Sequence, residues 1–181
     1  MGEQYIHTDA TFSDCGYYRY DLYRQWTDVS RPTCCFVLLN PSTADAETDD
    51  PTVRRCMKFA QRWGYGSAWV VNLFAYRATD PKMLRQGTDH PRSEPGDANR
   101  NVREIISKCR ASDRVVLAWG TYGSTLGAGR VMADKIRNEV APQHKLMCFG
   151  TTKDGHPKHP LYLPADQSLR PFDFKSYIGD D

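Results

Sequence analysis

The sequence has 181 residues, a hydrophobic content of 40% and a net charge of +2 at pH 7. This length suits one domain with a sizeable core, and we predict a single domain over residues 1–181 with its core at about 12–164. The nearly balanced charge excludes a polybasic protein, and the longest apolar runs are too short to span a membrane. No secretory signal pattern opens the chain, so we expect a cytoplasmic protein without a membrane partner.

The predicted elements alternate along the chain. An amino-terminal aromatic strand or hairpin, half-exposed because aromatic and charged residues alternate in it, precedes four short apolar strands and the helices between them. We expect strands at 17–26, 35–40, 67–76, 113–120 and 145–150, and helices at 50–64, 96–110 and 128–140. This alternation predicts a three-layer α/β/α fold with a central, mainly parallel four-stranded sheet.

Polar residues stand at the carboxyl ends of the predicted strands, where open parallel sheets bind their ligands. Asn40 ends the first apolar strand and is followed by Pro41 and Ser42, and Asn72 lies toward the end of the next strand. A carboxamide offers both a donor and an acceptor, so two of them in one crevice would suit a nucleobase edge or a water molecule. The alternative for each is an asparagine that caps a turn.

Aromatic residues and a glycine lie at the same strand ends. Phe74 follows Asn72 by two residues and is a candidate ligand contact, as is Trp119, which a core position would also explain. Gly120 lets a ligand or the backbone approach closely. The glycine-rich stretch 120–129 lacks the lysine of a P-loop and the GxGxxG pattern, so it gives little support to an ATP or dinucleotide site.

The loop between the first apolar strand and the first helix is long and charged, which is typical of loops that carry a site. Asp45 and Asp50 are candidate Mg²⁺ ligands or general bases, with solvated acids and a helix cap at Asp50 as the alternative. Arg54 and Arg55 lie in the first turn of the helix, where positive charge opposes the helix dipole. They are expected to pair with the preceding acids or to bind a phosphate.

Two histidines, His156 and His159, lie in the proline-rich loop after the last predicted strand. A histidine can donate a hydrogen bond to a leaving group or act as acid or base near neutral pH, whereas the alternative is a surface loop with solvated side chains. The six cysteines show no CxxC spacing and are interpreted as reduced, packed thiols. We therefore expect no metal and no cofactor, except that Mg²⁺ would accompany an acidic phosphate site.

The assembled motifs resemble two families. The segments "LLNPSTAD", "DDPTVRRC", "VVNLFAYRATDP" and "TKDGHPKHPLYLP" resemble DUF1643, a family of bacterial and phage proteins of unknown function. The order of the strand-end motifs is more distantly similar to the uracil-DNA glycosylase superfamily. There an Asp-Pro or Asn-Pro positions water, a later Asn reads the base, and Trp-Gly and His-Pro motifs complete the site.

The second resemblance implies a uracil-DNA glycosylase-like fold and a role for several residues. Asn40 would hold the attacking water, Asn72 would read a flipped base, and His159 would donate a hydrogen bond to the departing base. Leu161 would be the wedge inserted into the duplex. The sequence departs from that superfamily at Ser42, where the uracil-specific branch has tyrosine.

Three functions follow from these residues, each with a nucleotide or DNA as the partner. The leading prediction is a nucleobase-binding, glycosylase-like enzyme that excises or processes a modified base. The second is a nucleotide- or phosphate-binding enzyme without glycosylase activity. The third is a non-catalytic module that binds modified DNA.

Overall fold

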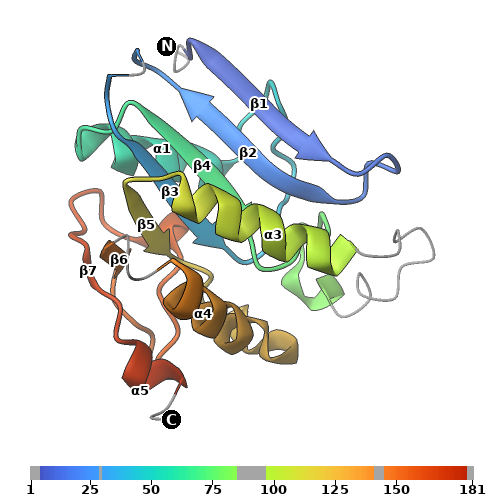
Figure 1. Ribbon diagram of the computed structural model, residues 1–181, viewed down its shortest axis with the longest axis vertical. Helices are drawn as coiled ribbons and strands as arrows, with labels where there is room; N and C mark the ends of the chain where they lie inside the picture. The colour runs from blue at the N-terminus through green and yellow to red at the C-terminus, as the bar shows by residue number, and fades with distance from the viewer. Residues whose placement is uncertain (1–4, 29, 85–96, 141–144, 179–181) are drawn as a thin grey trace.

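The computed structural model describes residues 5–28, 30–84, 97–140 and 145–178. The strands are β1 (His7–Phe12), β2 (Arg19–Gln25), β3 (Thr33–Leu38), β4 (Ser67–Asn72), β5 (Arg114–Leu117), β6 (Lys145–Cys148) and β7 (Arg170–Pro171). The helices are α1 (Pro51–Arg62), α3 (Asp97–Arg110), α4 (Ala128–Glu139) and α5 (Phe174–Ile178), with 3₁₀ turns η1 (Pro81–Met83), η2 (Thr121–Gly127) and η3 (Pro160–Tyr162). The protein therefore has the predicted α/β character (Figure 1).

The strands form one mixed seven-stranded sheet in the order β1-β2-β4-β3-β5-β6-β7. β4, β3, β5 and β6 pair in parallel, whereas β1, β2 and β7 join by antiparallel pairing. The prediction of four central strands was thus incomplete, because the amino-terminal hairpin and the short β7 belong to the same sheet. Parallel pairing in the centre follows from the helices that connect these strands.

Helices cover both faces of the sheet, and alternate residues of β3 show how the core divides. Cys35 and Val37 belong to a buried cluster that includes residues of α3 and α4. Phe36 and Leu38 belong to a second cluster, on the opposite face, that includes residues of α1. Figure 1 shows α3 and α4 together on the near side of the sheet and α1 behind it. β3 is therefore buried on both faces, as its continuously apolar sequence predicts.

α1 begins where the sequence predicts. Asp50 is its N-cap, and the carboxylate accepts a hydrogen bond from Val53 N at 2.8 Å. Pro51 occupies the first helical position, where a missing N–H costs no helical hydrogen bond. Gly64, with a φ of 83°, follows the end of the helix. This start of α1 fixes the position of Asp50 at the end of the loop that follows β3.

β2 is not the half-exposed strand that its aromatic-charged alternation predicts. Its charged residues Arg19, Asp21 and Arg24 are all at most 1% exposed. α3 contacts β2, and Lys108 of α3 lies 3.5 Å from the Asp21 carboxylate. Arg24 forms an ion pair with Asp49 at 2.8 Å. The charged residues are buried because β2 lies between two strands and is covered on both faces. Its charges therefore pair inside the protein.

The six cysteines are free, and five of them are buried. Cys35 Sγ and Cys109 Sγ lie 4.0 Å apart without a bond between them. Across the residues described here, none of the helices has the length and apolar character needed to cross a membrane.

Candidate functional site

The predicted site residues lie in the loops at the carboxyl ends of the four parallel strands. Asn40 follows β3 by two residues, and Asn72 is the last residue of β4. Trp119 follows β5 by two residues, and His159 lies in the loop that follows β6. Because parallel strands end at the same edge of a sheet, these loops are neighbours.

Backbone hydrogen bonds join the four loops in pairs. The loops after β3 and β4 are joined by Phe74 N, which donates to Leu39 O at 2.9 Å. The loops after β5 and β6 are joined by Gly120 N, which donates to Pro157 O at 2.8 Å. Gly120 has a φ of 73°, and a Cβ there would lie 3.2 Å from the Cβ of His159. A larger residue at this position would therefore push the His159 loop away.

Asn40 is held by both of its amide N–H groups. Nδ2 donates to Ala78 O at 2.6 Å and to Pro41 O at 3.0 Å. These bonds connect the loop after β3 with the loop after β4. Since both donors are occupied, Oδ1 is the group that the half-buried Asn40 presents to a ligand or a water molecule.

Asn72 is 1% exposed and is oriented by Arg19, a residue that the sequence prediction missed. Arg19 Nη2 donates to Asn72 Oδ1 at 3.2 Å, and Nη1 donates to Ala44 O at 2.9 Å. A guanidinium only donates, so the Asn72 oxygen must face it. The amide nitrogen, Nδ2, is then left buried and without a hydrogen-bond partner among the described residues.

A β-bulge explains why Arg19 reaches this position. The register of β1 and β2 shifts between Thr11 and Phe12, which pair with Asp21 and Arg19 respectively. β2 therefore has two residues opposite a one-residue step of β1. The extra residue places the Arg19 side chain on the opposite face of the sheet from the Asp21 side chain. Arg24 lies on the same side as Arg19, because its Nη2 donates to Asp45 O at 2.6 Å in the loop after β3.

Three buried polar atoms near the end of β4 have no hydrogen-bond partner in the described structure: Asn72 Nδ2, Arg19 Nε and Asn101 Oδ1. The Asn72 side chain lies with Arg19 on the α1 face of the sheet, because Asn72 pairs with Leu38 of the core cluster that includes α1. Asn101, on α3, lies on the opposite face and donates from Nδ2 to Asn72 O at 3.0 Å. An unsatisfied buried polar group costs about 1–3 kcal/mol, so Asn72 Nδ2 and Arg19 Nε favour a bound water or ligand.

His159 caps η3 and is held in one neutral form. Its Nδ1 accepts a hydrogen bond from Leu161 N at 3.4 Å. Burial lowers the pKa of His159 below 6.5, and the negative charge of Asp50 opposes this lowering only in part. Because Nδ1 is the acceptor, the proton of the neutral ring lies on Nε2. His159 is therefore a neutral hydrogen-bond donor at pH 7.

Asp50 acts electrostatically on His159 and Arg19. It is 7% exposed, and its charge raises the pKa of both His159 and Arg19. Burial nevertheless lowers the pKa of Arg19 to about 10, and no carboxylate of the described chain lies within 4.0 Å of it. Asp50, a candidate acid from the sequence, is thus both the N-cap of α1 and the acid whose charge acts on His159 and Arg19.

Three other candidates, two aromatic residues and one histidine, pack away from Asn72 and Arg19. The Trp119 indole is 1% exposed and packs in the core with Phe172 and Tyr177. Its Nε1 donates to Tyr177 Oη at 3.3 Å, and that hydroxyl lies 2.8 Å from His156 Nδ1. His156 thus contacts α5, and burial lowers its pKa below 6.5. Phe74 also packs against the core, on the side of α3 and α4.

The two arginines of the first helical turn contact backbone carbonyls. Arg54 donates to Asp49 O, and Arg55 donates to Leu163 O. The Arg55 guanidinium also lies 4.9 Å from the centre of the Phe59 ring. Asp45 accepts from the backbone N–H groups of residues 47 and 48, which lowers its pKa. No cluster of three His, Cys, Asp or Glu side chains suited to a metal occurs among the residues with described positions.

The profile of a family described as "Protein of unknown function (DUF1643)" matches residues 19–161 of the sequence. The chain belongs to the DUF1643 family. The DUF1643 match begins at Arg19 and ends at Leu161, so it contains all the candidate site residues. Neither a curated protein nor a solved structure matched the chain. The family is thus known, and the activity has to be argued from the site.

Proposed function

We propose that this protein binds a modified nucleobase in DNA and hydrolyses its N-glycosidic bond, on a fold similar to that of the uracil-DNA glycosylases. The observation that carries the proposal is the state of His159. It is a neutral imidazole whose Nδ1 is occupied by Leu161 N–H, so Nε2–H is available as a donor. A neutral donor suits a leaving base, because it stabilises the negative charge that develops as the bond breaks.

The neighbouring residues supply the other requirements of this reaction. Asn40 presents Oδ1, which would accept a hydrogen bond from the attacking water. The water oxygen bonds to C1′ of the sugar, the C1′–N bond breaks, and its electron pair leaves with the base. Asn72 Nδ2 would donate to a carbonyl on the base edge, which would satisfy an otherwise unpartnered buried group. The proton lost by the water goes to solvent or to the released base.

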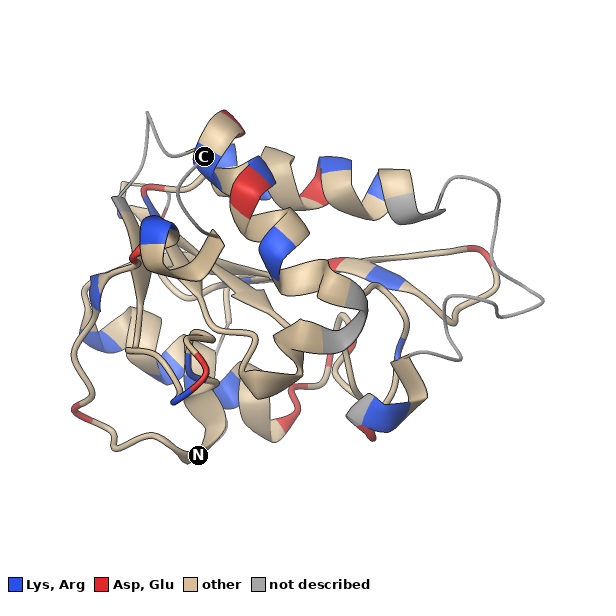
Figure 2. Ribbon diagram, turned by 90° about the horizontal axis from the view of Figure 1, so that it is seen from below, with Lys and Arg blue, Asp and Glu red and all other residues tan. Residues whose placement is uncertain are grey.

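The surface of α1 favours a polyanionic substrate. Arg54, Lys58 and Arg62 are exposed and follow one another at intervals of four residues, so they share one face of the helix. Figure 2 shows basic but no acidic positions along α1, whereas α3 carries both. α1 starts at Asp50, beside His159, so a DNA strand bound along this stripe would pass near the site.

The proposal is tested by release of free base from oligonucleotides that contain uracil, hydroxymethyluracil, alkylated or mismatched bases. Two variants separate the functions of His159. His159→Gln keeps an amide donor near the position of Nε2 but loses the acceptor for Leu161 N–H. His159→Asn keeps the acceptor near the position of Nδ1 but loses the donor. We expect His159→Asn to slow base release by about 10²–10³, and His159→Gln to slow it less.

Thermal unfolding of both variants shows whether either has lost its fold. An equal loss of activity in the two variants, with intact folding, would remove the donor role of His159. If the wild-type protein releases none of these bases, the glycosylase proposal is wrong. Lys58→Gln offers a further control, because it should weaken binding of all oligonucleotides alike and reduce the slope of log affinity against log salt by about one.

A further inference from the structure

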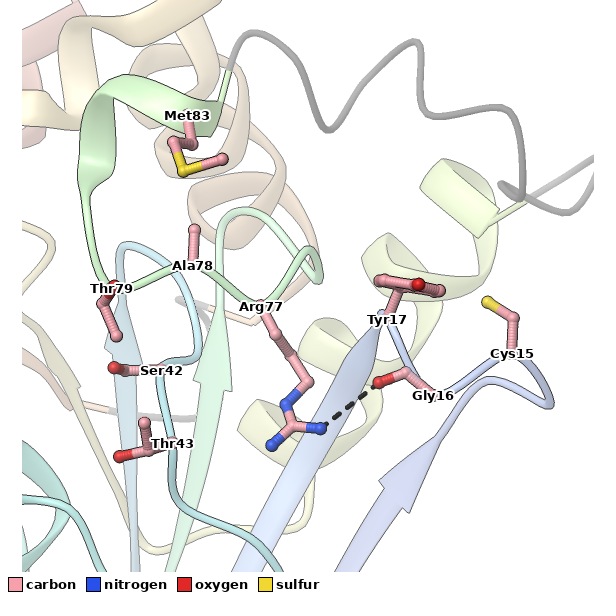
Figure 3. Close-up of a pocket in the computed structure, with 9 residues that line it drawn as sticks. All are labelled: Cys15, Gly16, Tyr17, Ser42, Thr43, Arg77, Ala78, Thr79 and Met83. Atoms are coloured by element: carbon pink, nitrogen blue, oxygen red, sulfur yellow. Dashed lines mark hydrogen bonds between the residues drawn. The ribbon is translucent and has the colours of Figure 1, made fainter.

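A hollow of about 630 Å³ lies beside the candidate site. Its wall is formed by the turn between β1 and β2, the loop after β3 and the loop after β4 (Figure 3). Ser42 from the loop after β3 and Ala78 from the loop after β4 both line it. Asn40 Nδ2 donates to Ala78 O, so Asn40 lies directly behind this wall. The hollow and the proposed base site therefore share a boundary.

Arg77 is the cation of this hollow. Figure 3 shows its side chain between the segment 42–43 and the segment 16–17. Nη1 donates to Gly16 O at 3.3 Å, and the guanidinium lies 5.0 Å from the centre of the Phe12 ring. Nε is buried without a partner, and no carboxylate of the described residues lies within 4.0 Å of Arg77. Its charge is strong enough locally to lower the pKa of Arg19 and of Asp45.

The remaining lining supplies flat apolar surface and hydroxyl groups. Tyr17 is 37% exposed and Met83 is 41% exposed, so both contribute apolar surface to the lining. Ser42, Thr43 and Thr79 add hydroxyl groups to the wall. An arginine without an acidic partner among the described residues suits a phosphate, and the partly exposed Tyr17 beside it offers aromatic surface to a base.

We propose that this hollow binds a phosphate-bearing nucleotide unit, with Arg77 on the phosphate and the Tyr17 ring stacked on a base. The inference deepens the proposed function, because it assigns a place to the part of the substrate that is not cleaved. It differs from the prediction of a phosphate at Arg54 or Arg55, both of which donate to backbone carbonyls. The bound nucleotide unit is either a free nucleotide or one nucleotide of a DNA strand, and the experiment below distinguishes the two.

Calorimetric titration tests this binding without any need for catalysis. The probes are thymidine, thymidine monophosphate and a single-stranded oligothymidylate. We expect the monophosphate to bind at least tenfold more tightly than thymidine, and Arg77→Gln to remove most of that difference. Tyr17→Leu should weaken binding of both compounds by a similar factor, because it removes stacking and leaves the cation in place.

Arg103→Gln is the matched control, because it removes the same charge from a different place. Arg103 lines a second hollow of about 580 Å³, on α3. It should leave binding of all three probes unchanged. Measurable and equal affinity of the wild-type protein for thymidine and its monophosphate overturns the proposal, as does oligonucleotide binding that Arg77→Gln leaves unchanged. Tight binding of the oligonucleotide with none of the monophosphate assigns the hollow to a DNA strand, whereas tight binding of both assigns it to the nucleotide unit itself. Phosphate-dependent binding without base release would support this site and reject the glycosylase proposal.

Discussion

Two buried arginines on β2 should differ in how strongly their replacement by methionine destabilises the protein. Arg19 and Arg24 are 1% and 0% exposed. Arg24 forms an ion pair with Asp49 at 2.8 Å, whereas Arg19 donates to neutral oxygen atoms, the Ala44 carbonyl and the Asn72 amide. We expect Arg19→Met to change the free energy of unfolding little and Arg24→Met to reduce it strongly.

The magnitudes follow from what each side chain leaves behind. Burial lowers the pKa of Arg19 to about 10, which corresponds to roughly 3 kcal/mol against the charged form in the folded protein. Methionine removes that penalty and loses two hydrogen bonds of about 1.5–3 kcal/mol each, one of which the Asn72 amide recovers in part by turning. The net loss should therefore stay below about 2 kcal/mol. Arg24→Met leaves the Asp49 carboxylate without its arginine, which typically costs about 3–5 kcal/mol.

Urea denaturation of the two variants measures this difference directly. If Arg19→Met destabilises the protein as much as Arg24→Met, the reasoning about the unpaired charge is wrong. The same pair of variants also separates stability from function. Because Arg19 fixes the Asn72 amide, Arg19→Met should abolish selective binding of a modified base while the protein remains folded.

Three further outcomes are expected. The free energy of unfolding should fall as the pH drops below 6.5 and then level off. Burial lowers the pKa of His159, so the unfolded chain takes up the proton first. A pH series of denaturation curves for wild type and His159→Asn measures how much of this fall comes from His159. Tyr177→Phe should cost about 1–3 kcal/mol in urea denaturation, because it leaves the buried Trp119 N–H without its acceptor, and free rotation of His156 should appear as a changed imidazole NMR signal. Asp50→Ser keeps an N-cap and should cost less than Asp50→Ala, for which the loss is about 1 kcal/mol. Both Asp50 variants should lower the pKa of His159 further in an NMR titration, because the charge that opposes the lowering is gone.

Much of the fold can be predicted from local sequence because its elements follow simple patterns. The Asp50-Pro51 pair marks the start of α1, and continuous apolar runs mark the strands that are buried on both faces. The order of strands in the sheet cannot be obtained this way, since it depends on contacts between distant segments. β7 was missed because a two-residue strand has no periodicity to detect. The glycine and proline residues of the segment 85–97 indicate a loop. That segment lies outside the described residues, apart from Asp97, which begins α3.

The candidate site was predictable only in part. Asn40, Asn72 and His159 stand at strand ends, so the topology predicts their common edge. Arg19 was not predictable, because the bulge in β2 breaks the two-residue alternation by which a strand residue is assigned to a face. The available sequence signal is that three of the seven residues of β2 are charged. Arg77 was missed as well, because its environment comes from three loops that are distant in sequence.

The two outermost strands of the sheet affect whether molecules can associate through strand edges. β1 and β7 both lie outside residues 19–161, the range that the family shares. Without them, β2 and β6 would become edge strands whose unpaired N–H and C=O groups are templates for pairing with another chain. β1 covers the edge of β2 with six residues, whereas β7 has only two. One of these two is Pro171, which has no N–H to donate. A chain trimmed to the shared range would keep Asn40, Asn72 and His159, would lose Tyr17 of the hollow, and would be prone to β-strand association between molecules.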